Sequence, residues 1–92
     1  MKLKDYRDRL DHIDGQIVEL FKARMETVKE IGLYKKAHDL PVLASGREQE
    51  ILQRIAQLCG EELAPYGQEL FTTLMALSRD YQDRLLREGE VE

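Results

Sequence analysis

The feature that most constrains this chain is a stretch, residues 4–38, in which nothing stops a helix. The stretch contains no proline, and its two glycines, Gly15 and Gly32, each cost a helix about 1 kcal/mol without ending it. Pro41 follows, and a proline pushes the residue before it out of the helical conformation. The sequence therefore predicts one continuous first helix over residues 4–39.

A helix of this length is too long for a compact monomer. About 35 residues at 1.5 Å each span about 52 Å, whereas a compact domain of 92 residues measures about 30 Å across. Apolar positions continue along most of the stretch, so the overhanging part must be covered. Cys59 is the only cysteine and no Cys/His cluster has metal-ligand spacing, so neither a disulfide nor a metal supports the core. We therefore expect a twofold homodimer.

A second helix is expected over residues 46–59, in the stretch "SGREQEILQRIAQLCG". Ser45 and Glu48 have the spacing of a capping box at its start, and Gly60 suits the position after its last residue. Apolar residues at helical spacing give this segment one apolar face.

The remaining residues predict a third helix over residues 65–87, because Pro65 is favourable in the first turn of a helix. The polar tail "EGEVE" is expected to fray. Alternation with the period of a strand, internal repeats and low-complexity segments are all absent from the sequence. We expect a single all-α domain over residues 1–92.

Charge and hydropathy exclude several classes of partner. Lysine and arginine total 14 against 18 aspartates and glutamates, a net charge of −4, which disfavours nucleic acid and anionic membranes. The sequence has no apolar run of about 18 residues, and its start has no apolar run of signal-peptide length. A cytoplasmic protein that binds neither nucleic acid nor membrane is expected.

Charged residues interrupt the apolar line of the first helix. At alternating spacings of three and four, the line contains Arg7, Leu10, Asp14, Ile17, Phe21, Arg24, Val28, Ile31 and Lys35. Buried charges are costly unless they are paired. One interpretation is that the long cationic side chains cover apolar surface and reach water at their tips. Three cations on one line favour the other interpretation, an anion held between the helices.

The other two helices carry polar residues at comparable positions. Arg47 lies one turn before Ile51 on the apolar face of the second helix, and Ser78 and Gln82 lie one turn apart in the apolar line of the third. These residues suit the same ligand site. However, buried Ser and Gln are also common as hydrogen-bonded core residues, and helix capping alone would explain Glu48.

Three segments resemble the all-helical (AroQ-class) chorismate mutases: "YRDRLDHIDGQIVELFKARMETVKEIGLYKK" their first helix, "LPVLASGREQEIL" their loop and second helix, and "LFTTLMALSRDYQ" their third. The resemblance covers residues 3–85. It implies an intertwined homodimer that converts chorismate to prephenate in the shikimate pathway, during phenylalanine and tyrosine biosynthesis. It also implies a reaction with no cofactor, no metal and no covalent intermediate.

Carried over position by position, the resemblance also implies a set of site residues. Lys35 and Gln82 would be catalytic and would face the ether oxygen of the substrate, where negative charge grows as the C–O bond breaks. The substrate-binding residues would be Arg7 of the partner subunit, Arg24, Arg47, Glu48 and Ser78. The two helix-one arginines would bind the carboxylates, and Glu48 would accept a hydrogen bond from the ring hydroxyl.

One residue departs from the family pattern. Ala44 stands where many members have an aspartate directed at the ring hydroxyl, so recognition of that group must rest on Glu48, backbone or water. With "ALSRDYQ", Ala44 makes the chain more similar to the mutase portions of two-domain enzymes that continue into prephenate dehydratase, a domain not expected within these residues.

Two other functions remain open. An isochorismate pyruvate lyase would have the same fold and a similar cationic pocket, and a non-catalytic helical dimerisation or regulatory module would need no ligand.

Overall fold

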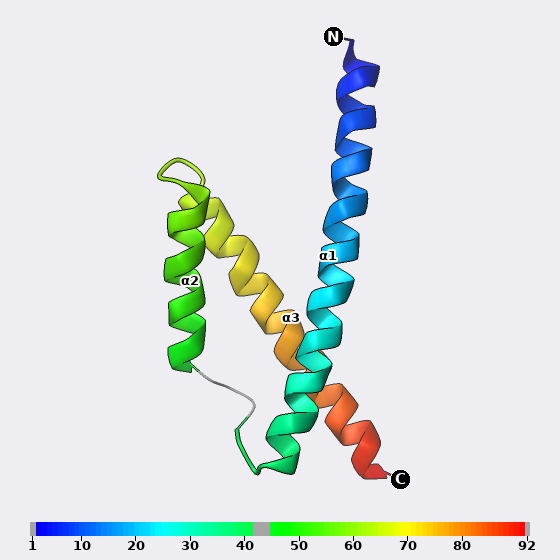
Figure 1. Ribbon diagram of the computed structural model, residues 1–92, viewed down its shortest axis with the longest axis vertical. Coiled ribbons are helices and arrows are strands. Elements are labelled where there is room, and N and C mark those ends of the chain that lie inside the picture. Colours follow the sequence, from blue (N-terminus) through cyan, green and yellow to red (C-terminus); the bar gives the residue numbers. More distant parts are fainter. Residues whose placement is uncertain (1, 42–44, 92) are drawn as a thin grey trace.

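The computed structural model describes residues 2–41 and 45–91, and within them the chain forms three α-helices and no strand (Figure 1). Helix α1 spans Leu3–Ala37, α2 spans Ser45–Cys59 and α3 spans Ala64–Val91. The expected fold class, all-α with a very long first helix, is confirmed.

Helix α1 ends at Ala37, two residues before the position expected from Pro41. Asp39 adopts a left-handed backbone conformation with φ of 55°, which aspartate tolerates better than most residues. The Leu40 N–H then donates to the Lys35 carbonyl, and the Asp39 N–H donates to the Lys36 carbonyl. This pair of hydrogen bonds is a Schellman motif, so local backbone bonds end the helix before the proline can.

Helix α3 continues to Val91, so the expectation of an end near residue 87 is wrong for the described residues, whereas the expected fraying of the tail stays a prediction. The tail has no proline, and its Gly89 costs a helix only about 1 kcal/mol. Polarity alone therefore does not end this helix.

Helix α3 lies between the other two helices and packs against both, whereas the backbones of α1 and α2 do not approach each other closely in the described residues. Helices α2 and α3 meet at a short turn that begins at Gly60, where φ is 81°, and they diverge away from it (Figure 1). In the part of the chain that the structure describes, the buried apolar side chains are Val28, Ile55 and Met75, one from each helix. This small core fixes the middle of α3 against its two neighbours.

The amino-terminal part of α1 extends away from the other helices and is exposed along its length (Figure 1). Its exposed apolar side chains are Leu3, Tyr6, Leu10, Ile13, Ile17, Val18, Leu20 and Phe21. The radius of gyration is 16.6 Å, against about 12 Å for a compact chain of this length. The accessible surface is 7547 Å², against about 5,500 Å² for a compact monomer of this mass. The chain by itself leaves a large apolar surface uncovered.

Candidate active site

A cleft of about 120 Å³, open to solvent, lies where the carboxyl-terminal half of α1, the start of α2 and the middle of α3 come together. Six of the seven residues expected from the sequence line it: Arg24, Lys35, Arg47, Glu48, Ser78 and Gln82. Their roles toward a substrate stay predictions. The seventh, Arg7, is exposed and lies about 25 Å from Arg24 along α1.

Helical periodicity brings the α1 residues into the cleft. Arg24 and Lys35 are three turns apart and therefore lie on one face of the helix. Val28 and Ile31 lie between them on the same face and also line the cleft. The two cations thus stand at the ends of a short apolar wall.

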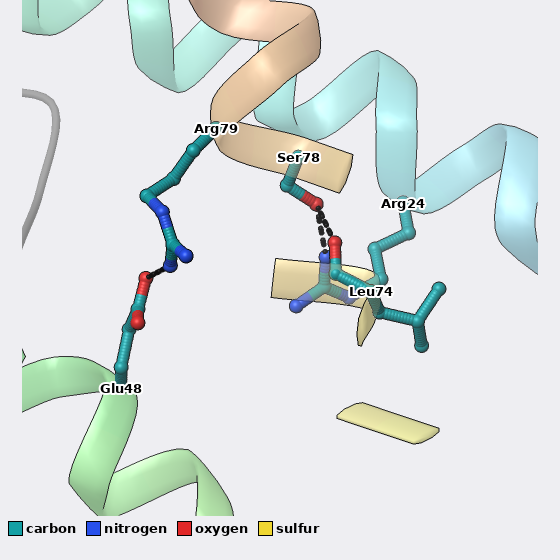
Figure 2. A network of polar contacts seen from close by, with 5 residues as sticks. All are labelled: Arg24, Glu48, Leu74, Ser78 and Arg79. Carbon is teal, nitrogen blue, oxygen red and sulfur yellow. Dashed lines mark hydrogen bonds and ion pairs between the residues drawn. The ribbon is translucent and has the colours of Figure 1, made fainter. Parts of the chain in front are cut away.

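Arg24 is held in place from α3 before any ligand binds. Its Nη1 donates a hydrogen bond of 2.8 Å to Ser78 Oγ, and its guanidinium lies 5.9 Å from the centroid of the Phe71 ring. The Ser78 hydroxyl in turn donates to the Leu74 carbonyl at 2.7 Å, as Figure 2 shows. A hydroxyl has a single hydrogen, so in this state Ser78 serves to orient Arg24.

Gln82 is anchored on the backbone of α1. Its side chain is 7% exposed, and Nε2 donates a hydrogen bond of 2.7 Å to the Val28 carbonyl. Gly32 allows this close approach, because a Cβ atom there would lie 3.2 Å from Gln82 Cγ. The amide nitrogen has two hydrogens, and one remains for a ligand in the cleft.

Arg79, a residue that the sequence analysis missed, also lines the cleft. Its Nη1 forms an ion pair with the Glu48 carboxylate across the space between α3 and α2 (Figure 2). Arg79 follows Met75 by four residues and precedes Gln82 by three, so the helical spacing used for the other residues was the signal that could have found it.

The carboxylate of Glu48 is therefore paired with Arg79. Its predicted capping partner, Ser45, is the first residue of α2. Ala44, where the family pattern has an aspartate, lies outside the described residues. Arg47 is exposed at the rim of the cleft, 3.4 Å from Glu50 Oε2, and a contact of this kind between exposed side chains contributes little to stability.

The cleft is strongly cationic in an acidic chain. Its four cationic side chains, Arg24, Lys35, Arg47 and Arg79, outnumber its single carboxylate, giving a formal charge of +3 against −4 for the whole chain. Such a site attracts a small anion with more than one negative group. No cluster in the described residues has the composition of a metal site, and none of the helices described is long and apolar enough to cross a membrane.

A family model and several curated relatives match this chain. The family model "Chorismate mutase type II" matches residues 6–83. The T-protein of Haemophilus influenzae is 41% identical over 51 residues, which are 55% of this chain and 14% of that protein. The bifunctional chorismate mutase/prephenate dehydratase of Aquifex aeolicus is 37% identical over 57 residues, 62% of this chain and 16% of that protein.

The chorismate mutase of Methanocaldococcus jannaschii is 29% identical over 91 residues, which are 97% of this chain and 92% of that protein. The chain thus spans about one seventh of the length of the first two relatives and nearly all of the third. No solved structure gave a significant match.

Proposed function

Because this chain belongs to the type II chorismate mutase family, we propose that it converts chorismate to prephenate by a [3,3] rearrangement. The observation that carries the proposal is the cleft in which Arg24, Lys35 and Gln82 come together from two helices. A rearrangement within one molecule needs no nucleophile. Positioning and electrostatic stabilisation can therefore supply the catalysis, and cations and amide donors supply both.

The cationic residues bind the two carboxylates and hold the substrate in its compact reactive conformation. Arg24 binds one of them through its planar guanidinium, which matches a carboxylate in shape and charge. Since Ser78 and Phe71 already hold Arg24, little conformational freedom is lost when the substrate binds. Arg47 adds positive charge at the rim.

Lys35 and Gln82 donate to the ether oxygen. Negative charge grows on this oxygen as the C–O bond breaks, so donors directed at it stabilise the transition state more than the ground state. The hydrogen bond from Gln82 to the Val28 carbonyl fixes the direction of the amide in advance. Glu48 accepts a hydrogen bond from the ring hydroxyl and so orients the ring.

The active molecule is a homodimer in which Arg7 of the partner subunit completes each site. This proposal is supported by an apolar groove of about 410 Å³ between α1 and α3. Its lining residues are Ile17, Val18, Leu20, Phe21, Arg24, Leu70, Phe71 and Leu74. The surface in excess of a compact monomer, about 2,000 Å², is of the size that obligate dimers bury per subunit. The long α1 of a second copy has the matching apolar face.

The test is to follow the disappearance of chorismate and identify the product, using the wild type, Lys35→Ala and Arg24→Ala. We expect each substitution to lower kcat/KM by about 100-fold or more, the usual effect of removing a charged group that contacts the transition state. Lys36→Ala removes an exposed neighbouring charge that does not line the cleft and should keep the wild-type rate.

The same assay separates the competing functions. Prephenate as the product supports the mutase, whereas salicylate and pyruvate from isochorismate would indicate the lyase. A folded dimer that converts neither compound would contradict both and leave a helical dimerisation module.

A further inference from the structure

The contact between Arg79 and Glu48 has no role in the chemistry proposed above. Both side chains are partly buried, with exposed fractions of 35% for Arg79 and 26% for Glu48, so their charges are screened less than those of surface pairs. They come from different helices and meet at the edge of the cleft (Figure 2).

The pair affects the position of α2. The backbone of this helix packs against α3, whereas the backbones of α1 and α2 do not approach each other closely in the described residues. The turn at Gly60 joins α2 to α3 at the end away from the cleft, and the two helices diverge toward it (Figure 1). Gln68 Nε2, on α3, donates a 3.2 Å hydrogen bond to the Leu52 carbonyl of α2 and so joins the two helices. The Arg79–Glu48 pair links them again in the first turn of α2, at their open ends.

The pair also affects the charge of the cleft. A carboxylate beside a site for a doubly negative substrate repels that substrate, unless a cation compensates it. Arg79 provides this compensation directly. The pair also restricts the rotation of the Glu48 side chain, while a carboxylate has enough lone pairs to accept a second hydrogen bond from another direction.

On these grounds we propose that Arg79 is a positioning residue, which holds the start of α2 at the cleft and presents the Glu48 carboxylate to the ring hydroxyl of the substrate. The proposal rests on the function proposed above. It assigns Arg79 an effect on substrate binding that is transmitted through Glu48, without contact between Arg79 and the reacting atoms.

The test compares chorismate with an analogue in which hydrogen replaces the ring hydroxyl, measured as an inhibitor. For Arg79→Met we expect KM for chorismate to rise about tenfold, the usual effect of losing one hydrogen bond to a charged group. The rate constant kcat should change much less, because this hydrogen bond is present in both ground and transition states. Binding of the analogue should weaken less than that of chorismate, because the uncompensated Glu48 carboxylate repels both dianions but only chorismate loses the contact with the ring hydroxyl.

Further variants show whether the effect passes through Glu48. The double variant Arg79→Met/Glu48→Gln should be no worse than Glu48→Gln alone, because the two residues act as one unit. Arg79→Lys should recover part of the affinity, since it keeps the charge. Arg87→Met removes an exposed arginine from α3 and is the matched control with wild-type KM.

Hydrogen exchange gives a readout that does not depend on turnover. In the substrate-free dimer, Arg79→Met should speed amide exchange in the first turns of α2 while leaving the end of α2 near Cys59 unchanged, and Arg87→Met should do neither.

The failures are distinguishable. A wild type that does not convert chorismate contradicts the proposed function. If the wild type is active, three results would contradict the Arg79 proposal alone. They are a wild-type KM in Arg79→Met, an equal loss of affinity for chorismate and the analogue in that variant, and additive losses in the double variant. Unchanged exchange at the start of α2 contradicts the proposed hold on that helix.

Discussion

At the scale of single residues, the site is organised by contacts that exist before a ligand arrives. Ser78 holds Arg24, the Val28 carbonyl holds Gln82, and Arg79 holds Glu48. In each case a side chain with a proposed role toward the substrate has its direction set by the protein. Such preorganisation lowers the cost of binding and of reaching the transition state.

The first prediction at this scale concerns Gly32. In Gly32→Ala the new Cβ would crowd Gln82 Cγ and shift the amide relative to the ether oxygen. We expect kcat to fall about tenfold, since a small displacement of a catalytic donor is costly. The free energy of unfolding should change little, because alanine is the better helix former by about 1 kcal/mol and this gain offsets the crowding.

The control for this prediction is Gly15→Ala, at a position in α1 with no atom within 4 Å of the added Cβ. It should gain the same helix propensity and keep the wild-type kcat. An unchanged kcat in Gly32→Ala would show that Gln82 tolerates the crowding or does not contribute to the rate.

The second prediction concerns the hydrogen bond from Arg24 to Ser78. Ser78→Ala removes the acceptor of the Arg24 hydrogen bond, so the guanidinium gains freedom that substrate binding must remove. We expect KM to rise about tenfold. Thr72→Ala is a close match, because Thr72 Oγ1 also donates to the carbonyl four residues earlier, at 2.8 Å, but lies outside the cleft. Equal KM values for the two variants would contradict the role given to Ser78.

Most residues of the cleft could be predicted from the sequence, because charged residues within an apolar line of a helix are easily recognised. Sequence reasoning placed Arg24 and Lys35 on one face, and that placement needs only the helical period. It missed Arg79 because this residue does not belong to the single line that was followed along α3. It also read Glu48 as either a cap or a ligand group, since a contact between α2 and α3 depends on how those helices cross.

At the scale of helices, α3 determines how the other two are arranged. The existence of three helices could be predicted from composition and from the proline and glycine residues that begin or end helices. Two ends could not: Asp39 adopts a left-handed conformation that stops α1 early, and the polar tail stays helical to Val91. Both depend on small backbone preferences of about 1 kcal/mol or less, which periodicity does not report.

The prediction at this scale tests the packing of α2 on α3. A Cβ atom at Gly67 would lie well inside van der Waals contact with Cys59 Sγ and close to Ile55 Cγ2. We expect Gly67→Ala to lower the free energy of unfolding by about 1–3 kcal/mol through overpacking. Gly46→Ala, where no atom lies within 4 Å, should not be destabilised. Denaturant unfolding of both variants would check this, and equal midpoints would contradict the close packing.

At the scale of the whole molecule, the chain is extended and its core is small. Sequence length predicted that α1 would overhang, and the extent of 54 Å along the longest axis agrees with that reasoning. The sequence could not reveal how much surface remains open, because that depends on the angle at which α3 crosses α1.

The prediction at this scale concerns a site shared between subunits. Arg7→Ala and Arg24→Ala should each be inactive as homodimers. After subunit exchange between equal amounts, about half of the dimers are mixed, and each mixed dimer has one site with both arginines intact. The mixture should therefore recover about one quarter of the wild-type activity. No recovery in a mixture shown to contain mixed dimers would mean that both arginines act within one subunit.

The small core has a consequence for gene dosage. Within the described residues the buried apolar side chains are Val28, Ile55 and Met75, so a lone chain has little to keep it folded. In the proposed homodimer, folding and the encounter of two chains therefore become one event. The amount of paired protein then rises with the square of the amount of chain when chains are scarce. Halving expression at that level would leave about one quarter of the active sites rather than one half. A cell that makes this protein would therefore control its flux steeply through synthesis alone.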